Sequence, residues 1–592
     1  MGEAKHIVPE PLERDPRDVE SLDVWGFRDT RFRVRPDGVV ELTGSRYPLC
    51  AEKLADLLPW VQRTIHPAVA ADDLNPSRYP PPVPEPRRQP AFVDELRKLF
   101  DADQLTEDAL LRLRHGHGHT QAEMYAIKYG RLERVPDLVV YPASETQVEA
   151  LVEAALRHDV CLIPYGGGTN VTEALLCPSE ESRTIVSVDM SRMSRVLWID
   201  PENAMACIEA GAVGRDLAAQ LARHGYTLGH EPDSIEFSTL GGWIATHASG
   251  MKKNRYGNIE DLVLDVTVVT ARGKLERMGF GPRESIGVGD ARRWLYGSEG
   301  GLGIITRAVV RIFPLPEAQV YGSILFPSFE SGVGFLHELT RRGEPPASVR
   351  LVDNLQFQLG QKLKSPSRGA RKLLSALQKG FVTRVKGFDP ERVSACTLLF
   401  EGSRREVAAQ QKSVYRIAAE FGGMKAGADN GSRGYQLTFG IAYIRDWIMN
   451  HFMIGESFET SVPWSQALAL CDSVKRRIRE EHARRKLPGT PFVTCRVTQL
   501  YATGVCVYFY FAYYFKGVEN PSRIYAEIEE AARDEVLRCG GTLSHHHGVG
   551  KLRRGFLPRI HSAGMLSWSR SIKQAVDPTN VFGAGNQNFG GS

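Results

Sequence analysis

The feature that most restricts the fold of this chain is a series of glycine-rich segments, each placed at the end of an apolar run. They occupy positions 165–170 (YGGGTN), 232–242 (PDSIEFSTLGG), 248–250 (ASG) and 297–306 (GSEGGLGIIT). Consecutive glycines let backbone N–H groups approach a phosphate closely and adopt φ values that other residues avoid. A simple glycine-rich turn is the better explanation of one such loop alone. The ordered set suits a pyrophosphate and a ribityl chain lying along the backbone.

The spacing of these glycines excludes the two best-known phosphate-binding motifs. The G-x-G-x-x-G fingerprint of dinucleotide-binding domains is missing, and the first glycine run follows the second strand of its unit rather than the first. No Lys-Ser or Lys-Thr follows the run, which excludes a P-loop. Another phosphate-binding architecture is therefore expected.

Apolar periodicity around the loops predicts an α/β unit. Strands are expected at 137–141, 160–164, 184–188 and 205–209, and a hairpin around 271–274, with the unit closing at 304–314. A Ser-x-x-Gln capping box at 144–147 followed by apolar residues at helical spacing predicts a helix, and 213–224 predicts another.

The character of the chain changes after Pro316, where longer helical stretches alternate with strands. The predicted fold class is α+β with two lobes. We predict an irregular and helical N-terminal region at 1–133, a ligand-binding α/β domain at 134–316, an α+β cap domain at 317–545 and a C-terminal segment at 546–592 that completes the site.

Composition narrows the class of protein further. Lys plus Arg number 74 and Asp plus Glu 70, a net charge of +4, which is too balanced for a surface that clamps nucleic acid, and no nucleic-acid partner is expected. The nine cysteines are dispersed without a C-x-x-C pair, which favours a reducing compartment over a disulfide or zinc framework. No stretch reaches the ~18 apolar residues of a membrane-spanning helix. A large soluble enzyme is the expected class.

A strand and helix before PYGGGTN, followed by PDS, Gly-Gly and GSEGGLGIIT, resembles the flavin-binding domain of the vanillyl-alcohol oxidase superfamily. The resemblance implies a two-lobed fold of that type with non-covalently bound FAD. The implied FAD contacts are Pro164, Tyr165, Gly166, Gly167, Gly168, Thr169, Asn170, Pro232, Asp233, Ser234, Ile235, Glu236, Phe237, Ser238, Ala245, Thr246, His247, Ala248, Glu299, Gly300, Gly301, Leu302, Gly303, Ile304 and Ile305.

Motifs in the second half narrow the resemblance. YIRD at 443–446, GESFET at 455–460, CRVTQ at 495–499, VYFYF at 507–511 and LSHHHGVGK at 543–551 are similar, taken together, to the alkyldihydroxyacetonephosphate synthase family. The family implies an FAD-dependent transferase of ether-lipid (plasmalogen) biosynthesis, which replaces the acyl chain of 1-acyl-dihydroxyacetone phosphate with a long-chain fatty alcohol. It implies no net redox change and a covalent adduct at flavin N5. The main alternative is an FAD-dependent 2-hydroxy-acid dehydrogenase of the same superfamily, and a third class is a catalytically inactive lipid-binding scaffold, against which the intact glycine-rich loops argue.

The same motifs supply the candidate catalytic residues. His545, His546 and His547 point in different directions in either a strand or a helix, so one metal ion would rarely use all three, and no metal site is expected. Imidazoles titrate near neutrality and suit proton transfer or phosphate contact, whereas a satisfied surface cluster is the simpler alternative. The resemblance implies that the three line the substrate site.

Tyr508 corresponds to the catalytic tyrosine of the family. It shares one strand face with Tyr510 and Tyr514, for which a packed core position is the expected role. A phenol needs nearby positive charge to act as a base, and the histidines and arginines of the pocket are candidates to supply it.

The resemblance also assigns anion-binding residues. Arg445 corresponds to a substrate-binding arginine, against the alternative of a surface ion pair with Asp446, and Arg350 to a second important arginine; Arg496 is a weaker candidate. His115, His117 and His119 alternate with glycines, and a loop packed near the flavin domain is preferred over a metal chelate.

Residues 362–388 contain eight basic residues, no acidic ones and an apolar stripe at helical spacing. Such a segment predicts contact with an anionic membrane surface, and a solvated basic helix is the alternative. The family implies a homodimer in a peroxisome or a related organelle, on the lumenal face of the membrane. Neither terminus shows a clear import signal.

Overall fold

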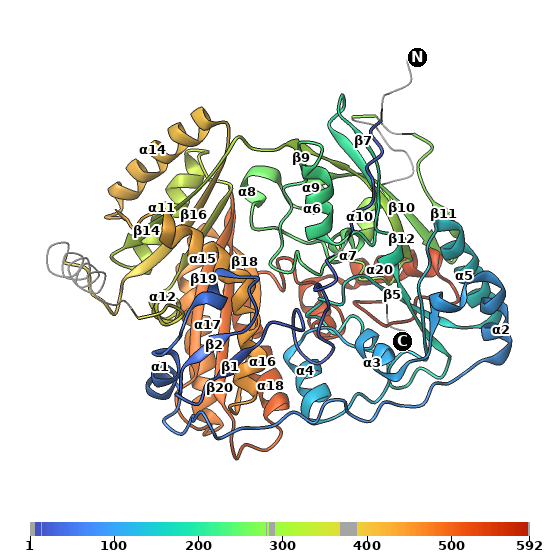
Figure 1. The fold of residues 1–592 in the computed structure, drawn as a ribbon, viewed down its shortest axis with the longest axis horizontal. Coiled ribbons are helices and arrows are strands. Elements are labelled where there is room, and N and C mark those ends of the chain that lie inside the picture. The colour runs from blue at the N-terminus through green and yellow to red at the C-terminus, as the bar shows by residue number, and fades with distance from the viewer. Residues whose placement is uncertain (1–5, 14, 280, 283–289, 367–386, 590–592) are drawn as a thin grey trace.

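The computed structural model describes residues 6–13, 15–279, 281–282, 290–366 and 387–589 (Figure 1). Two halves lie side by side, one built around two smaller sheets and the other around one large sheet (Figure 1). No helix in the described part of the chain combines the length and the apolar character needed to cross a bilayer.

The first sheet of the smaller-sheet half contains three parallel strands in the order β4 (Leu138–Val140), β6 (Ile185–Asp189) and β5 (Cys161–Tyr165). The short β3 (Leu105–Thr106) pairs antiparallel with β4, although it precedes the boundary predicted at residue 134. The helix α5 (Glu145–His158) crosses between β4 and β5, and its apolar stripe is buried. Its cap differs in detail from the prediction: Ser144 Oγ accepts from the Gln147 amide, whereas the Gln147 side chain accepts from Ala143.

The second sheet is antiparallel, in the order β11 (Gly273–Leu275), β10 (Val263–Thr270), β12 (Ile304–Arg311), β8 (Met205–Glu209) and β7 (Val196–Asp200). Its apolar core is shared with α6 (Gly214–Ala222) and α7 (Leu240–Thr246). Strands and helices thus lie close to the predicted positions, and the glycine-rich segments connect or begin them.

The large sheet is antiparallel and has seven strands. In order they are β17 (Met424–Lys425), β14 (Ala318–Phe326), β16 (Ser394–Gly402), β15 (Ser348–Val352), β19 (Phe492–Tyr501), β20 (Gly504–Tyr514) and β18 (Met453–Pro463). One face shares the largest apolar core of the molecule with α11 (Phe329–Arg341), α14 (Arg404–Glu420), α17 (Ala467–Arg484) and α18 (Pro521–Arg538). On the opposite face, α15 (Ala428–Ile441) packs against β14 and β16 and α16 (Ile444–Met449) packs against β18, and the part of β18, β19 and β20 that they leave free faces the site.

Both ends of the chain complete this arrangement. The N-terminal β1 (Phe32–Val34), β2 (Val40–Leu42) and α1 (Leu57–Thr64) share an apolar cluster with α16 (Ile444–Met449) of the large-sheet half. The C-terminal α20 (Ala563–Val576) returns to the smaller-sheet half (Figure 1). There Lys573 Nζ donates to the Gly301 carbonyl at 2.9 Å. The remaining α-helices of the described residues are α2 (Pro90–Leu99), α3 (Ala109–His115), α4 (Gln121–Tyr129), α8 (Lys253–Tyr256), α9 (Ile259–Leu262), α10 (Arg292–Leu295), α12 (Asn354–Lys362) and α19 (Leu557–Ile560).

Candidate active site

A cavity of about 510 Å³ lies between the glycine-rich loops and the free face of the seven-stranded sheet. Most of the predicted flavin contacts line it. They are Pro164, Tyr165, Gly166, Gly167, Gly168, Thr169, Asn170, Pro232, Asp233, Ser234, Ser238, Ala245, Thr246, Ala248, Glu299, Gly300, Gly303, Ile304 and Ile305. Segments separated by more than a hundred residues therefore meet at one wall.

Six of the predicted flavin contacts lie outside the lining of the cavity. They are Ile235, Glu236, Phe237, His247, Gly301 and Leu302. The carboxylate of Glu236 accepts from the Tyr47 hydroxyl at 2.8 Å, and His247 lies 3.1 Å from the Glu260 carboxylate. The side chains of Glu236 and His247 therefore hold the loops in place. A sequence motif does not distinguish this role from contact with the ligand.

The first glycine run fits the phosphate-bearing part of FAD because it presents bare backbone to the cavity. A Cβ atom on Gly167 would overlap the Phe237 carbonyl, and Gly168 has φ +64°, a conformation that favours glycine. Behind Gly168 lies the Arg114 guanidinium, whose Nη1 is buried without a hydrogen-bond partner among the described residues. Close backbone and an incompletely paired cation together favour an anionic ligand at this wall.

The opposite wall is the free face of β18, β19 and β20, where residues at period two face the cavity. Directly opposed residues form rows across the three strands: Ser457, Tyr510 and Thr494 in one row, and Glu459, Tyr508 and Arg496 in the next. The alternate residues, among them Phe509, Phe511 and Val493, enter the core beneath α17 and α18. The predicted division of this strand into a tyrosine face and a phenylalanine face is confirmed. The core role expected for Tyr510 is wrong, because its side chain lines the cavity.

The histidine loop approaches Tyr508 from the C-terminal segment. The Tyr508 hydroxyl and His546 Nε2 lie 2.6 Å apart, and His546 and His547 line the cavity. His545 lies behind them and does not line it. Glu459 holds the loop, because its buried carboxylate accepts from the backbone amides of all three histidines.

The histidines do not titrate near neutrality, contrary to the prediction. Burial is the main cause that lowers the pKa of His545 to about 3 and the pKa values of His546 and His547 to about 4. They are therefore uncharged at neutral pH and do not supply positive charge to a phenolate. Burial also raises the pKa of Tyr508 well above its usual value.

Positive charge next to Tyr508 comes instead from Arg496, whose guanidinium carbon lies 4.4 Å from the centre of the tyrosine ring. Asp233 lies between two arginines, with Arg350 Nη2 at 2.8 Å and Arg496 Nη2 at 2.9 Å. Burial raises the pKa of Asp233, but the two cations outweigh burial and lower it to about 2. Arg350 therefore supports an ion-pair network behind Tyr508, and Asp233 has a structural partner besides any cofactor.

Arg445, on α16, lines the cavity and is not a surface residue. Its Nη1 donates to the His119 carbonyl, and its Nε is buried without a partner among the described residues. The alternative ion pair with Asp446 is weak, because Asp446 is 2.9 Å from Lys128 Nζ and 3.8 Å from Arg445. Arg445 thus has unused hydrogen-bonding capacity at the cavity, as anion binding requires.

Sequence reasoning did not single out Glu456 and His119 as site residues, although both line the cavity. Burial raises the pKa of Glu456 to about 8 against the opposing charge of Arg445, 3.9 Å away. The available signal was the Glu456 carboxylate inside the GESFET motif at 455–460. His117 and His119 are buried in a loop beside the flavin-binding wall, as predicted, whereas His115 is the buried last residue of α3, with its Nε2 2.8 Å from Asp189. Within the described part of the chain they form no metal-binding group.

An apolar region continues the cavity away from these polar groups. Its side chains come from α1, α12, α16 and the neighbouring strand ends, and include Trp60, Leu359, Trp447 and Met453. The basic segment begins at Lys362, the last residue of α12, but residues 367–386 lie outside the described part of the chain.

Comparisons with known proteins match this geometry. The family described as "FAD binding domain" matches residues 136–279, and the family described as "FAD linked oxidases, C-terminal domain" matches residues 315–586. The chain is thus an FAD-linked enzyme with the two-lobed, mixed α+β fold of the vanillyl-alcohol oxidase type, as the sequence predicts.

Relatives define the family more narrowly. An alkyldihydroxyacetonephosphate synthase of Caenorhabditis elegans is 42% identical over 98% of this chain and 97% of its own length. One from Dictyostelium discoideum is 35% identical over 84% of this chain and 81% of its own. A solved structure of an alkyldihydroxyacetonephosphate synthase superposes with a TM-score of 0.83, at 30% identity, covering 96% of this chain and 99% of that one. This chain belongs to the alkyldihydroxyacetonephosphate synthase family.

Proposed function

We propose that this chain is an FAD-dependent transferase that exchanges the acyl chain of 1-acyl-dihydroxyacetone phosphate for a long-chain fatty alcohol. The product, alkyl-dihydroxyacetone phosphate, carries the ether bond of ether lipids. The observation that carries the proposal is the shared cavity, in which Tyr508, His546 and Arg445 face the glycine-rich loops. The apolar region around Trp60 and Met453 suits a long hydrocarbon chain.

The role of each residue of the site follows from the chemistry of its side chain. FAD, when bound in its reduced form, supplies a nucleophilic N5 atom. Arg445 binds the phosphate or the departing carboxylate, since a guanidinium pairs with either through two hydrogen bonds. The Tyr508 hydroxyl receives the proton of the incoming alcohol as it passes its own proton to His546 Nε2, to which it is already hydrogen-bonded. Arg496 and Asp233 fix the ring of Tyr508 for this transfer.

The test is turnover without an electron acceptor. Purified protein is incubated anaerobically with acyl-dihydroxyacetone phosphate and radiolabelled hexadecanol, and label is expected in alkyl-dihydroxyacetone phosphate with no change in flavin absorbance at the end of the reaction. Flavin bleaching by D-lactate or glycolate without label transfer would instead assign the chain to the 2-hydroxy-acid dehydrogenases and contradict the proposal.

We propose further that FAD is held without a covalent bond, by the backbone of the glycine-rich loops. Acid precipitation should release all the flavin into the supernatant, and flavin that stays with the precipitated protein would contradict this. The bare backbone at 166–168 supports the proposal, because it supplies contacts with N–H groups rather than with nucleophilic side chains.

Three properties of the family extend to this chain as proposals. It acts as a homodimer, it contacts a membrane through the basic segment 362–388, and it resides in a peroxisome or related organelle. Light scattering of the purified protein tests the first and fractionation of cells the last. Replacing four basic residues of the segment by glutamate should reduce binding to anionic liposomes, and unchanged binding would exclude this contact.

A further inference from the structure

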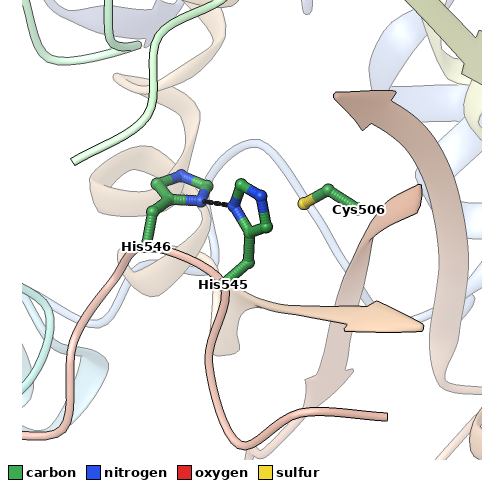
Figure 2. Close-up of side chains that lie close together, drawn as sticks. All are labelled: Cys506, His545 and His546. Atoms are coloured by element: carbon green, nitrogen blue, oxygen red, sulfur yellow. Dashed lines mark hydrogen bonds between the residues drawn. The ribbon is translucent and has the colours of Figure 1, made fainter. Parts of the chain in front are cut away.

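Tyr508 is the first member of a continuous chain of four hydrogen-bonding side chains. Its hydroxyl lies 2.6 Å from His546 Nε2, His546 Nδ1 lies 2.7 Å from His545 Nδ1, and His545 Nε2 lies 2.6 Å from the Tyr501 hydroxyl. Figure 2 shows the hydrogen bond between the two imidazoles, whose planes are nearly perpendicular at 87°. Each of the four ring nitrogens is therefore part of the chain.

These contacts determine where the protons lie. Two Nδ1 atoms at hydrogen-bond distance require that one carries a proton and the other does not. With both rings neutral, Tyr508 donates to His546, His546 Nδ1–H donates to His545, and His545 Nε2–H donates to Tyr501. The reverse polarity satisfies the same contacts. The chain thus has two equivalent neutral states that differ by the passage of one proton.

The same residues could be mistaken for a metal site, because the ligand atoms of Cys506, His545 and His546 lie within 4.8 Å of one another (Figure 2). A metal ion needs a ring nitrogen with a free lone pair, and every ring nitrogen here already has a hydrogen-bond partner. Burial raises the pKa of the Cys506 thiol well above its usual value, which disfavours the thiolate that binds metals. The geometry therefore favours proton transfer.

The proposed reaction needs such a path. The alcohol loses its O–H proton when its oxygen bonds to C1, and the fatty acid leaves as a carboxylate, so each turnover releases one proton inside the cavity. We propose that Tyr501, through His545 and His546, relays this proton from Tyr508 to the surface of the protein. The inference depends on the proposed function.

The relay transfers one proton without leaving a charge on either histidine. One proton enters at the Tyr508 oxygen, each group passes its own proton to the next, and one proton leaves from Tyr501, so no imidazolium forms. This suits the surroundings, because burial lowers the pKa values of both histidines. A return passage of one proton, or rotation of the two rings, restores the starting tautomers.

Tyr501 is suitably placed to end the relay. It is the last residue of β19, it is partly exposed, and the turn residues Ala502 and Thr503 that follow are exposed. Lys253 Nζ lies 3.5 Å from the centre of its ring and donates to the Leu500 carbonyl at 2.6 Å. Tyr501 does not line the cavity. Its hydroxyl is connected to the cavity through the two histidines and also through Asn258, whose Nδ2 donates to it at 3.2 Å and whose Oδ1 accepts from Ser249 Oγ at the cavity wall. The path through the histidines is the one that includes Tyr508.

The test is Tyr501→Phe in the FAD-loaded full-length enzyme, since this change removes the hydroxyl and keeps the ring that contacts Lys253. The matched control is Tyr514→Phe on β20, whose hydroxyl is buried without a partner among the described residues. Ether formation is followed by rapid quench and proton release by a pH indicator, in H2O and D2O, with and without added imidazole.

Tyr501→Phe should lower kcat by about 10²-fold, the lower end of the range for general acid–base catalysis. KM should stay within twofold, the solvent isotope effect should increase, and imidazole should restore part of the rate. Tyr514→Phe should match the wild type. Wild-type kcat and isotope effect in Tyr501→Phe would overturn the relay, as would loss of wild-type activity to a chelator with recovery on adding zinc. If the proposed function is wrong, the wild type itself fails to incorporate the alcohol.

Discussion

Glu459→Gln is the substitution that tests most directly how the site is held together. Glu459 is 1% exposed and stands opposite Tyr508 in the sheet. Its Oε1 accepts from Ser544 Oγ at 2.6 Å and from the His547 amide at 2.7 Å, while its Oε2 accepts from the His545 amide. One carboxylate therefore fixes the entire histidine loop against the strand that carries Tyr508.

The size of the effect follows from these contacts. A glutamine keeps one oxygen, so at least the bond to the His545 amide is replaced by two opposed donors. Loss of a hydrogen bond to a charged group costs ~1.5–3 kcal/mol. For a domain of about 150–250 residues, the size class of the cap domain predicted at 317–545, a loss of about 2 kcal/mol lowers Tm by roughly 4–8 °C. A displacement of the histidines by about 1 Å would cost about 10²-fold in kcat.

Thermal unfolding and steady-state turnover, measured on the same preparations, separate the two effects. The control is Glu481→Gln on α17, a carboxylate that is 5% exposed, lies 2.8 Å from Arg477, and does not line the cavity. It should lower Tm without changing kcat. If Glu459→Gln lowers Tm but keeps kcat within twofold of the wild type, Glu459 does not position the histidines and the reasoning is refuted.

Three further substitutions test the cavity. Gly167→Ala should abolish FAD binding, measured as flavin per protein, because the new Cβ overlaps the Phe237 carbonyl; Gly360→Ala, with no atom within 4 Å of its Cβ, should bind FAD fully. Arg445→Lys should raise KM for acyl-dihydroxyacetone phosphate by about 10–100-fold, since losing a bidentate contact costs ~1.5–3 kcal/mol, and an unchanged KM would exclude anion binding by Arg445. Glu456→Gln should stabilise the protein by an amount that grows between pH 4.5 and about 8, because the raised pKa of Glu456 makes ionisation in the unfolded chain favour unfolding over that range. A constant difference in Tm across that range would show that Glu456 is ionised in the folded protein.

Local sequence pattern predicts the strands and helices of this chain well. The strand predicted at 205–209 is observed at Met205–Glu209, and the helix predicted after Ser144 is observed at Glu145–His158. The alternation of tyrosine and phenylalanine along β20 also identified its two faces. Each of these features depends on residues only a few positions apart in the sequence. The spacing of the apolar residues directly indicates which side of a helix or strand is buried.

The electrostatic character of the site could not be predicted in the same way. Asp233 forms ion pairs with Arg350 and Arg496, which lie 117 and 263 positions away in the sequence. A motif assigns Asp233 to the flavin without revealing these partners. The charge of the histidines was predicted wrongly for a related reason. Their pKa depends on burial by segments from both halves of the chain, and no local pattern reports it.

The arrangement of the seven-stranded sheet explains why one cavity can serve both a polar reaction and a long hydrocarbon chain. Along β18, β19 and β20, successive rows on the free face change from Gly455, Ala512 and Phe492, through Ser457, Tyr510 and Thr494, to Glu459, Tyr508 and Arg496. Polarity and charge thus increase along the strands in steps of two residues, because every second residue faces the same side. The apolar region of the cavity continues from the first row, and the histidine loop docks at the last. A lipid substrate whose hydrocarbon chain lies along these strands therefore has its polar head directed to the proton-transfer groups, Tyr508 and His546. Insertion of a single residue into β20 would exchange this face with the core face and remove both functions together.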